Sequence, residues 1–216
     1  MSVSKRIILP SVVLALLGGA AIQQTTSATT VQQNIADLSS QAINQVKISN
    51  NTDNIYIKTG EKLSVDYDGP KDSAPIVQVK DNCLELTPRH RFSFNFFSRN
   101  TYTITITLPQ AKLQSFSIDS SNGDVKVDKI YADKGHISTS NGDIIISNLI
   151  SQFGFELSSS NGDIVVEHNN ASGYDFSNSN GTNTFENTTV SNSFAKMHSK
   201  NNVLEINNSN GDIVIN

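Results

Sequence analysis

The chain has 216 residues, and its 16 Lys and Arg against 20 Asp and Glu give a formal net charge of −4. Apolar residues make up 37% and charged residues 17%, and much of the remainder consists of 29 Ser, 16 Thr and 25 Asn. The acidic balance excludes a basic nucleic-acid binder. The single cysteine, Cys83, excludes a disulfide framework and a cysteine-built zinc site.

The N-terminus has the organisation of an export signal. Lys5 and Arg6 precede an apolar stretch at residues 7–22, and Thr26-Ser27-Ala28 places small residues before a cleavage site. We therefore expect residues 1–28 to be a signal peptide and the protein to act outside the cell or at the cell surface. An uncleaved N-terminal anchor is the alternative, although a membrane span needs about 20 apolar residues.

The next part of the chain is expected to be irregular β structure. Residues 29–42 form a lead-in segment, and residues 43–109 hold short alternating apolar and polar runs separated by turn signals such as Asp68-Gly69-Pro70. In residues 101–109, Thr alternates with larger apolar side chains, which is typical of a half-exposed strand. No linker composition follows, so we expect residues 43–109 and 110–216 to form one continuous body.

Residues 110–216 are a repeat. The tetrapeptide Ser-Asn-Gly-Asp begins at Ser121, Ser140, Ser160 and Ser209, and the variant Ser-Asn-Gly-Thr begins at Ser179. Around each copy, apolar residues alternate with polar ones at the period of a strand. A single unit cannot bury its apolar face, but stacked units can. We predict an all-β fold, a parallel β-solenoid of about five coils of 19–21 residues, with Lys200-Asn201-Asn202 as a degenerate turn and the final copy as a half-coil cap.

The turn residues are expected to be structural. Glycine accepts a positive φ, and the Asn side chains of successive coils should stack as a ladder of amides. The residues concerned are Asn122, Gly123, Asn141, Gly142, Asn161, Gly162, Asn180, Gly181, Asn210 and Gly211.

The order of these elements resembles a bacterial family. An export signal, alternating strands, Ile-Thr-Leu-Pro at residues 106–109 and the repeated Ser-Asn-Gly-Asp turn are similar to the putative-adhesin family of unknown function, toastrack-like β-solenoids that include LiaG-like and LiaF-like envelope proteins. The resemblance covers about residues 43–216. It implies a non-catalytic module of the cell envelope, an adhesin or an envelope-stress-associated binding protein. The several membrane spans of LiaF-like relatives have no counterpart in this sequence.

The repeat offers candidates for metal binding and for glycoside hydrolysis. Asp124, Asp143 and Asp163 should stack on one edge, where they lie in water or a cation such as Ca²⁺ bridges them; purely structural turns are the favoured interpretation. The four histidines fall at different phases of the repeat and predict no metal site. The alternative function, a secreted polysaccharide-active enzyme, would need two carboxylates within reach of one glycosidic bond. We expect no cofactor and no catalytic residue.

The segment of residues 89–99 combines charge and aromatic side chains. It holds every arginine that follows the predicted signal peptide, namely Arg89, Arg91 and Arg99, and alternates Phe92, Phe94 and Phe96 with polar residues. It predicts either a hairpin whose Phe face lies in the core or an exposed tip. An exposed tip would contact an anionic envelope polymer, a lipid surface or an envelope protein.

Overall fold

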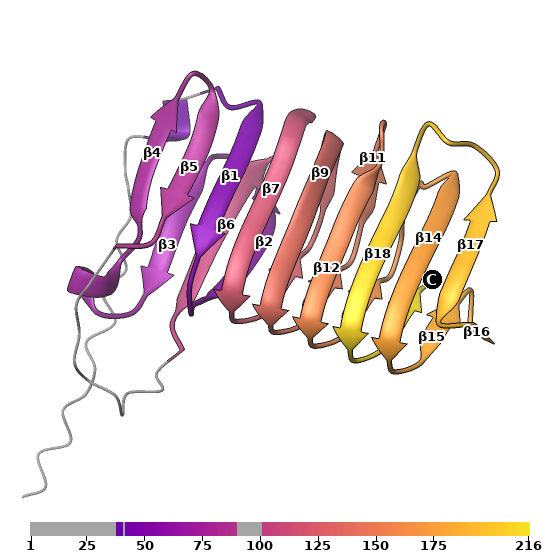
Figure 1. Cartoon of the computed structure of the whole chain (residues 1–216). Helices are drawn as coiled ribbons and strands as arrows, with labels where there is room; N and C mark the ends of the chain where they lie inside the picture. The colour runs from indigo at the N-terminus through magenta and orange to yellow at the C-terminus, as the bar shows by residue number, and fades with distance from the viewer. Residues whose placement is uncertain (1–37, 41, 90–100) are drawn as a thin grey trace, which may run out of the picture.

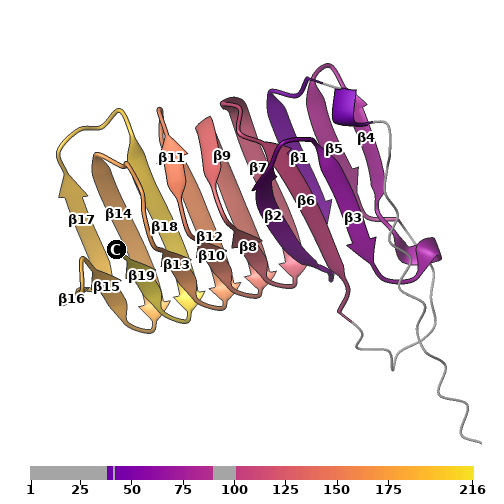
Figure 2. The ribbon, with the colours of Figure 1, turned by 180° about the vertical axis from the view of Figure 1, so that it is seen from behind.

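The computed structural model describes residues 38–40, 42–89 and 101–216. In these residues the chain forms two facing sheets, of ten and nine strands, together with the short 3-10 helices η1 (Leu38–Ser40) and η2 (Lys71–Ser73). Figure 1 shows the molecule with the first sheet toward the viewer. Figure 2 shows it from behind, with the second sheet toward the viewer. The prediction of an all-β fold is confirmed.

The strands of each sheet follow one another along the long axis of the molecule (Figure 1). The first sheet has the order β4 (Ile76–Lys80), β5 (Cys83–Thr87), β1 (Gln45–Asn50), β7 (Leu113–Asn122), β9 (Ile130–Asn141), β12 (Phe155–Asn161), β18 (Val203–Asn210), β14 (Gly173–Asn180) and β17 (Ser193–Met197), with β11 (Leu149–Ser151) also paired to β9. The second has the order β3 (Ser64–Asp68), β6 (Thr103–Pro109), β2 (Asn54–Gly60), β8 (Val125–Val127), β10 (Ile144–Ile146), β13 (Ile164–Val166), β19 (Ile213–Ile215), β15 (Asn183–Phe185) and β16 (Thr188–Val190).

Each repeat is one coil of a parallel solenoid. A long strand of the first sheet runs into the Ser-Asn-Gly turn and continues as a three-residue strand of the second sheet. Equivalent residues stack, as Ile118 does on Ile137 and Ile144 on Ile164, so every coil buries the same columns between the sheets. The five coils are β7–β8, β9–β10, β12–β13, β14–β15 and β18–β19. The predicted parallel β-solenoid of about five coils is confirmed.

The order of the coils corrects the prediction for the C-terminus. Strands β18 and β19 do not cap the stack but lie between β12–β13 and β14–β15, in parallel pairing with both neighbours. The chain skips one level after β13, and the last repeat fills that level as a full coil. A half-coil cap is therefore wrong, because the final repeat has a coil on each side.

Asn202 is not a turn residue of the repeat. It is buried, and its Nδ2 donates hydrogen bonds to the carbonyl oxygens of Ser151 and Asn170, both at 3.0 Å. Its Oδ1 accepts a hydrogen bond of 2.6 Å from the Ser151 hydroxyl. The predicted degenerate turn is wrong, since Asn202 instead ties the returning chain to the corners of two other coils.

Residues 43–109 continue the same two sheets. Strand β1 pairs in parallel with both β5 and β7, and β2 pairs in parallel with both β6 and β8. The first coil of the chain, β1–β2, therefore lies inside the stack, between β5 and β6 on one side and β7 and β8 on the other. The irregular appearance of this part of the sequence arises from its different turns, because its strands follow the same pairing as the repeats.

Both ends of the stack close with antiparallel strands. Strands β3 and β4 cover one end, and β16 and β17 cover the other. The β4–β5 and β15–β16 turns have two residues each, Asp81-Asn82 and Glu186-Asn187, all with φ between 49° and 60°. Such turns match the twist of a hairpin. The hairpins thereby end the parallel ladders at short edge strands.

Candidate functional site

The glycines of the repeated turns have positive φ. The values are 111° at Gly123, 147° at Gly142, 146° at Gly162, 144° at Gly181 and 129° at Gly211. The turns also stack closely: a Cβ on Gly162 would lie 2.1 Å from the carbonyl oxygen of Gly142. Glycine is thus required both by the backbone angle and by the neighbouring coil.

The turn asparagines form a ladder that runs in one direction. The Nδ2 of Asn141 donates to Oδ1 of Asn122 at 2.9 Å, and that of Asn161 donates to Asn141 at 3.0 Å. The ladder continues from Asn210 to Asn161 and from Asn180 to Asn210. Its order follows the spatial order of the coils, with the last repeat of the sequence in fourth place.

The turn aspartates stack on one edge, as expected from the sequence, and form a ladder of hydrogen bonds to the backbone that sequence reasoning did not anticipate. Oδ1 of Asp124 accepts the backbone N–H of Asp143 at 3.1 Å, and Oδ1 of Asp143 accepts that of Asp163 at 2.8 Å. The same bond joins Asp212 to Asp163 and Thr182 to Asp212. Each carboxylate therefore has a backbone donor from the next coil. Within residues 38–40, 42–89 and 101–216, no group of three or more His, Cys, Asp or Glu is arranged to hold a metal ion.

The predicted surface contact falls largely outside the structure. Arg89 is exposed just after β5. Arg91, Phe92, Phe94, Phe96 and Arg99 lie outside the described residues, so the proposed role of residues 89–99 stays a prediction.

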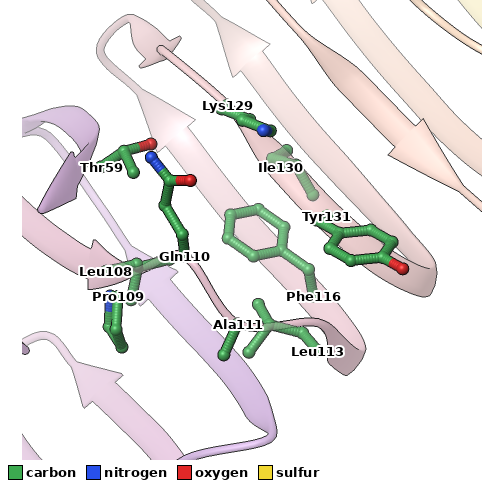
Figure 3. A pocket seen from close by; sticks show the side chains of 10 residues that line it. All are labelled: Thr59, Leu108, Pro109, Gln110, Ala111, Leu113, Phe116, Lys129, Ile130 and Tyr131. Atoms are coloured by element: carbon green, nitrogen blue, oxygen red, sulfur yellow. The ribbon is translucent and has the colours of Figure 1, made fainter. Parts of the chain in front are cut away.

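A pocket opens where the chain leaves β6 in the second sheet and crosses to β7 in the first (Figure 3). Its volume is about 240 Å³. It is lined by Thr59, Leu108, Pro109, Gln110, Ala111, Leu113, Phe116, Lys129, Ile130 and Tyr131. The sequence hinted at this position only through the break in alternation after Pro109, which does not by itself predict a cavity.

The pocket has an apolar floor and a polar rim. Leu108, Leu113, Phe116 and Ile130 belong to the buried core, so the pocket reaches the space between the sheets. The Tyr131 side chain, by contrast, is 43% exposed. A preformed apolar cavity with a few polar groups at its mouth is typical of a small-ligand site.

Lys129 is the charged residue of the pocket lining, and no described residue forms an ion pair with it. Lys112, which follows the lining residue Ala111, differs in this respect. Its ammonium pairs with Asp133, and that hydrogen bond raises the pKa of Lys112. The cation available to a ligand in the pocket is therefore Lys129.

The described part of the chain holds no helix with the length and apolar character of a membrane span. The ten pocket residues include no carboxylate and no histidine.

Comparisons with known proteins agree with this architecture. The family model of the toastrack domain DUF4097 matches residues 43–216. No curated protein matches the chain significantly.

Among solved structures, a protein of Clostridium sporogenes named a putative cell adhesion protein is similar at 16% identity with a TM-score of 0.53, over 81% of this chain and 93% of that one. A putative adhesin of Bacteroides fragilis has 18% identity and a TM-score of 0.37, over 86% and 96% of the two chains. One of Parabacteroides distasonis has 13% identity and a TM-score of 0.45, over 88% and 82%. At such identities, the clostridial likeness shows a common fold.

Proposed function

The chain belongs to the toastrack DUF4097 family, and from this premise we propose that it is an exported, non-catalytic binding module of the cell envelope, in adhesion or in sensing of envelope stress. The observation that carries the proposal is the pocket between β6 and β9, with its apolar floor and with Lys129, which forms no ion pair with a described residue. The clostridial protein with the same fold is named a putative cell adhesion protein, which supports a binding role.

The pocket chemistry indicates the class of ligand. Its floor accepts a small apolar group, because burying apolar surface gains about 25 cal/mol per Å². Lys129 at the rim favours an anionic group attached to it. A short acyl or branched chain bearing a carboxylate or phosphate has this chemistry, whether it belongs to an envelope lipid or to a surface polymer.

The pocket predicts a charge-selective binding experiment. Octanoate should bind more tightly than octylamine, which has the same chain and the opposite charge, in isothermal titration calorimetry. Lys129→Gln should weaken octanoate binding about tenfold, since a charge-assisted hydrogen bond contributes about 1.5 kcal/mol. Ala111→Phe should abolish it, because the exposed Ala111 side chain lines the pocket and a larger ring would fill it.

Lys47→Gln is the matched control, since Lys47 is exposed on β1 and lies outside the pocket lining. It removes the same charge and should leave octanoate binding unchanged. Equal binding of octanoate and octylamine, or an equal loss in the Lys47 and Lys129 variants, would show that the pocket does not select its ligand.

Export predicts a processed N-terminus. Protein recovered from the medium or from the cell surface should begin near Thr29, because Thr26 and Ala28 place small residues three positions and one position before the cleavage site. Intact-mass spectrometry checks this directly. Recovery of all the protein with residues 1–28 attached would favour the uncleaved anchor, and its retention in the cytoplasm would contradict export.

A further inference from the structure

The outer face of the second sheet carries a row of apolar side chains. The central residues of β10, β13 and β19 are Ile145, Val165 and Val214, which stand in register on adjacent coils. Their neighbours within each strand are buried, whereas these three are half-buried and do not belong to the core cluster. They point away from the core, and each shields the next.

A row of three aspartates borders the apolar row on one side, and a single acid, Glu167, borders it on the other. Asp143, Asp163 and Asp212 precede the three apolar residues by two positions, which places them on the same face about 7 Å away. Glu167, with Ser147 and Asn216, follows by two positions on the other side. The hydrogen bonds of the aspartate ladder use one oxygen of each carboxylate and hold the acids in line.

At both ends of the row, the equivalent position holds a polar or charged residue. On β8 the equivalent position is Lys126, whose ammonium lies 5.7 Å from the ring centroid of Tyr56. On β15 it is Thr184. Between these ends, residues 142–148, 162–168 and 211–216, which hold β10, β13 and β19, present carboxylates, amides and the apolar row, and contain no Lys or Arg. We call the residues Asp143, Ile145, Asp163, Val165, Glu167, Asp212 and Val214 the acidic–apolar face.

The opposite face of the solenoid is different. At the matching level of the first sheet, the outward residues are Ser117, His136, Glu156, Glu205 and Asp175. A strand does not need apolar residues at these outward positions. Thr, which also has a high strand propensity, occupies the equivalent position 184 on β15. A contiguous apolar row rimmed by polar residues instead marks an interaction surface.

We propose that the acidic–apolar face docks a cationic amphipathic polypeptide segment, with apolar side chains on the central row and Lys or Arg on its flanks. Charge decides the partner: the aspartate row and Glu167 attract a cationic segment and repel an anionic lipid or polymer. A second copy of this chain, joined through the same face, would bring the same acidic side chains together and add no Lys or Arg. The surface lies on the outside of β10, β13 and β19 and is independent of the pocket.

A labelled amphipathic Leu/Lys peptide tests the proposal by fluorescence anisotropy, with a scrambled peptide of the same composition as reference. The amphipathic peptide should bind the full chain, and the scrambled one should bind at least about tenfold more weakly. The triple variant Ile145→Thr, Val165→Thr, Val214→Thr keeps strand propensity and should lose about tenfold of the affinity. Ala111→Phe, which fills the separate pocket, should leave the affinity for the peptide unchanged.

A second experiment tests the acidic side chains by comparing two double variants of equal net charge. Asp163→Asn with Glu167→Gln should weaken binding, whereas Glu156→Gln with Glu205→Gln, on the opposite face, should not. Equal weakening by both, or equal binding of the two peptides, would show general attraction to an acidic protein and overturn the proposal. A homodimer that the triple Thr variant dissociates, measured by analytical ultracentrifugation, would assign the face to a second copy instead.

Discussion

Deleting residues 203–216 is expected to unfold much more of the protein than the deleted residues themselves. Strand β18 joins β12 to β14, and β19 joins β13 to β15. Without them, β14 keeps only its antiparallel pairing with β17, and β15 keeps only that with β16. Isolated two-stranded pairs are marginal in water. The cluster of Tyr174, Phe176, Phe185 and Phe194 would lose its support from the stack as well.

Hydrogen–deuterium exchange distinguishes the observed order, in which β18–β19 lies between β12–β13 and β14–β15, from a solenoid whose coils stack in chain order. In the deletion variant, residues 173–197 should lose protection while β7–β10 keep it. A serial solenoid would lose only its end, since β14 and β15 would rest on β12 and β13. Persisting protection of residues 173–197 would contradict the coil order. The control is Val214→Thr, an outward substitution that should leave the exchange pattern of the full chain unchanged.

Gly162→Val is expected to be the most damaging single substitution in the repeated turns. At φ 146° a β-branched side chain is strained, and its Cβ would lie 2.1 Å from the Gly142 carbonyl oxygen. Backbone strain costs about 1–3 kcal/mol, and forcing atoms into a packed site costs about the same again. The free energy of unfolding should therefore fall by about 3 kcal/mol or more.

Ser160→Val is the matched control, because Ser160 precedes the same turn and its side chain is exposed. Adding the same side chain there should change stability by less than about 0.5 kcal/mol. Urea denaturation followed by circular dichroism measures both variants. Similar midpoints for the two would mean that the turns of β12–β13 and β9–β10 are not in contact.

The architecture of one coil could be predicted from sequence because its determinants are local. Alternation of apolar and polar residues identifies a strand with one buried face. Asn-Gly supplies a turn with positive φ, and the recurrence of both at a nearly constant spacing indicates coils that stack in register. The stacking of the aspartates followed from the same period, but their hydrogen bonds did not, since each depends on a backbone N–H of the neighbouring coil that no sequence period reveals.

The order of the coils was decided by tertiary structure alone. All five turns present the same glycine and the same asparagine amide to their neighbours, so the last repeat fits between two earlier coils as well as it fits at the end. One local sign of the true order is present: the coil beside the closing hairpin has Thr182 where the others have Asp, and no further turn follows it as a backbone donor. The pocket likewise arises only when β6 and β9, distant along the chain, are brought together by the stacking of their coils. Local periodicity thus determines what each coil is, whereas the pairing of near-identical coils depends on long-range contacts. Among these, β16 and β17 close the stack beside β15 and β14, and the buried Asn202 joins the last repeat to the corners of two other coils.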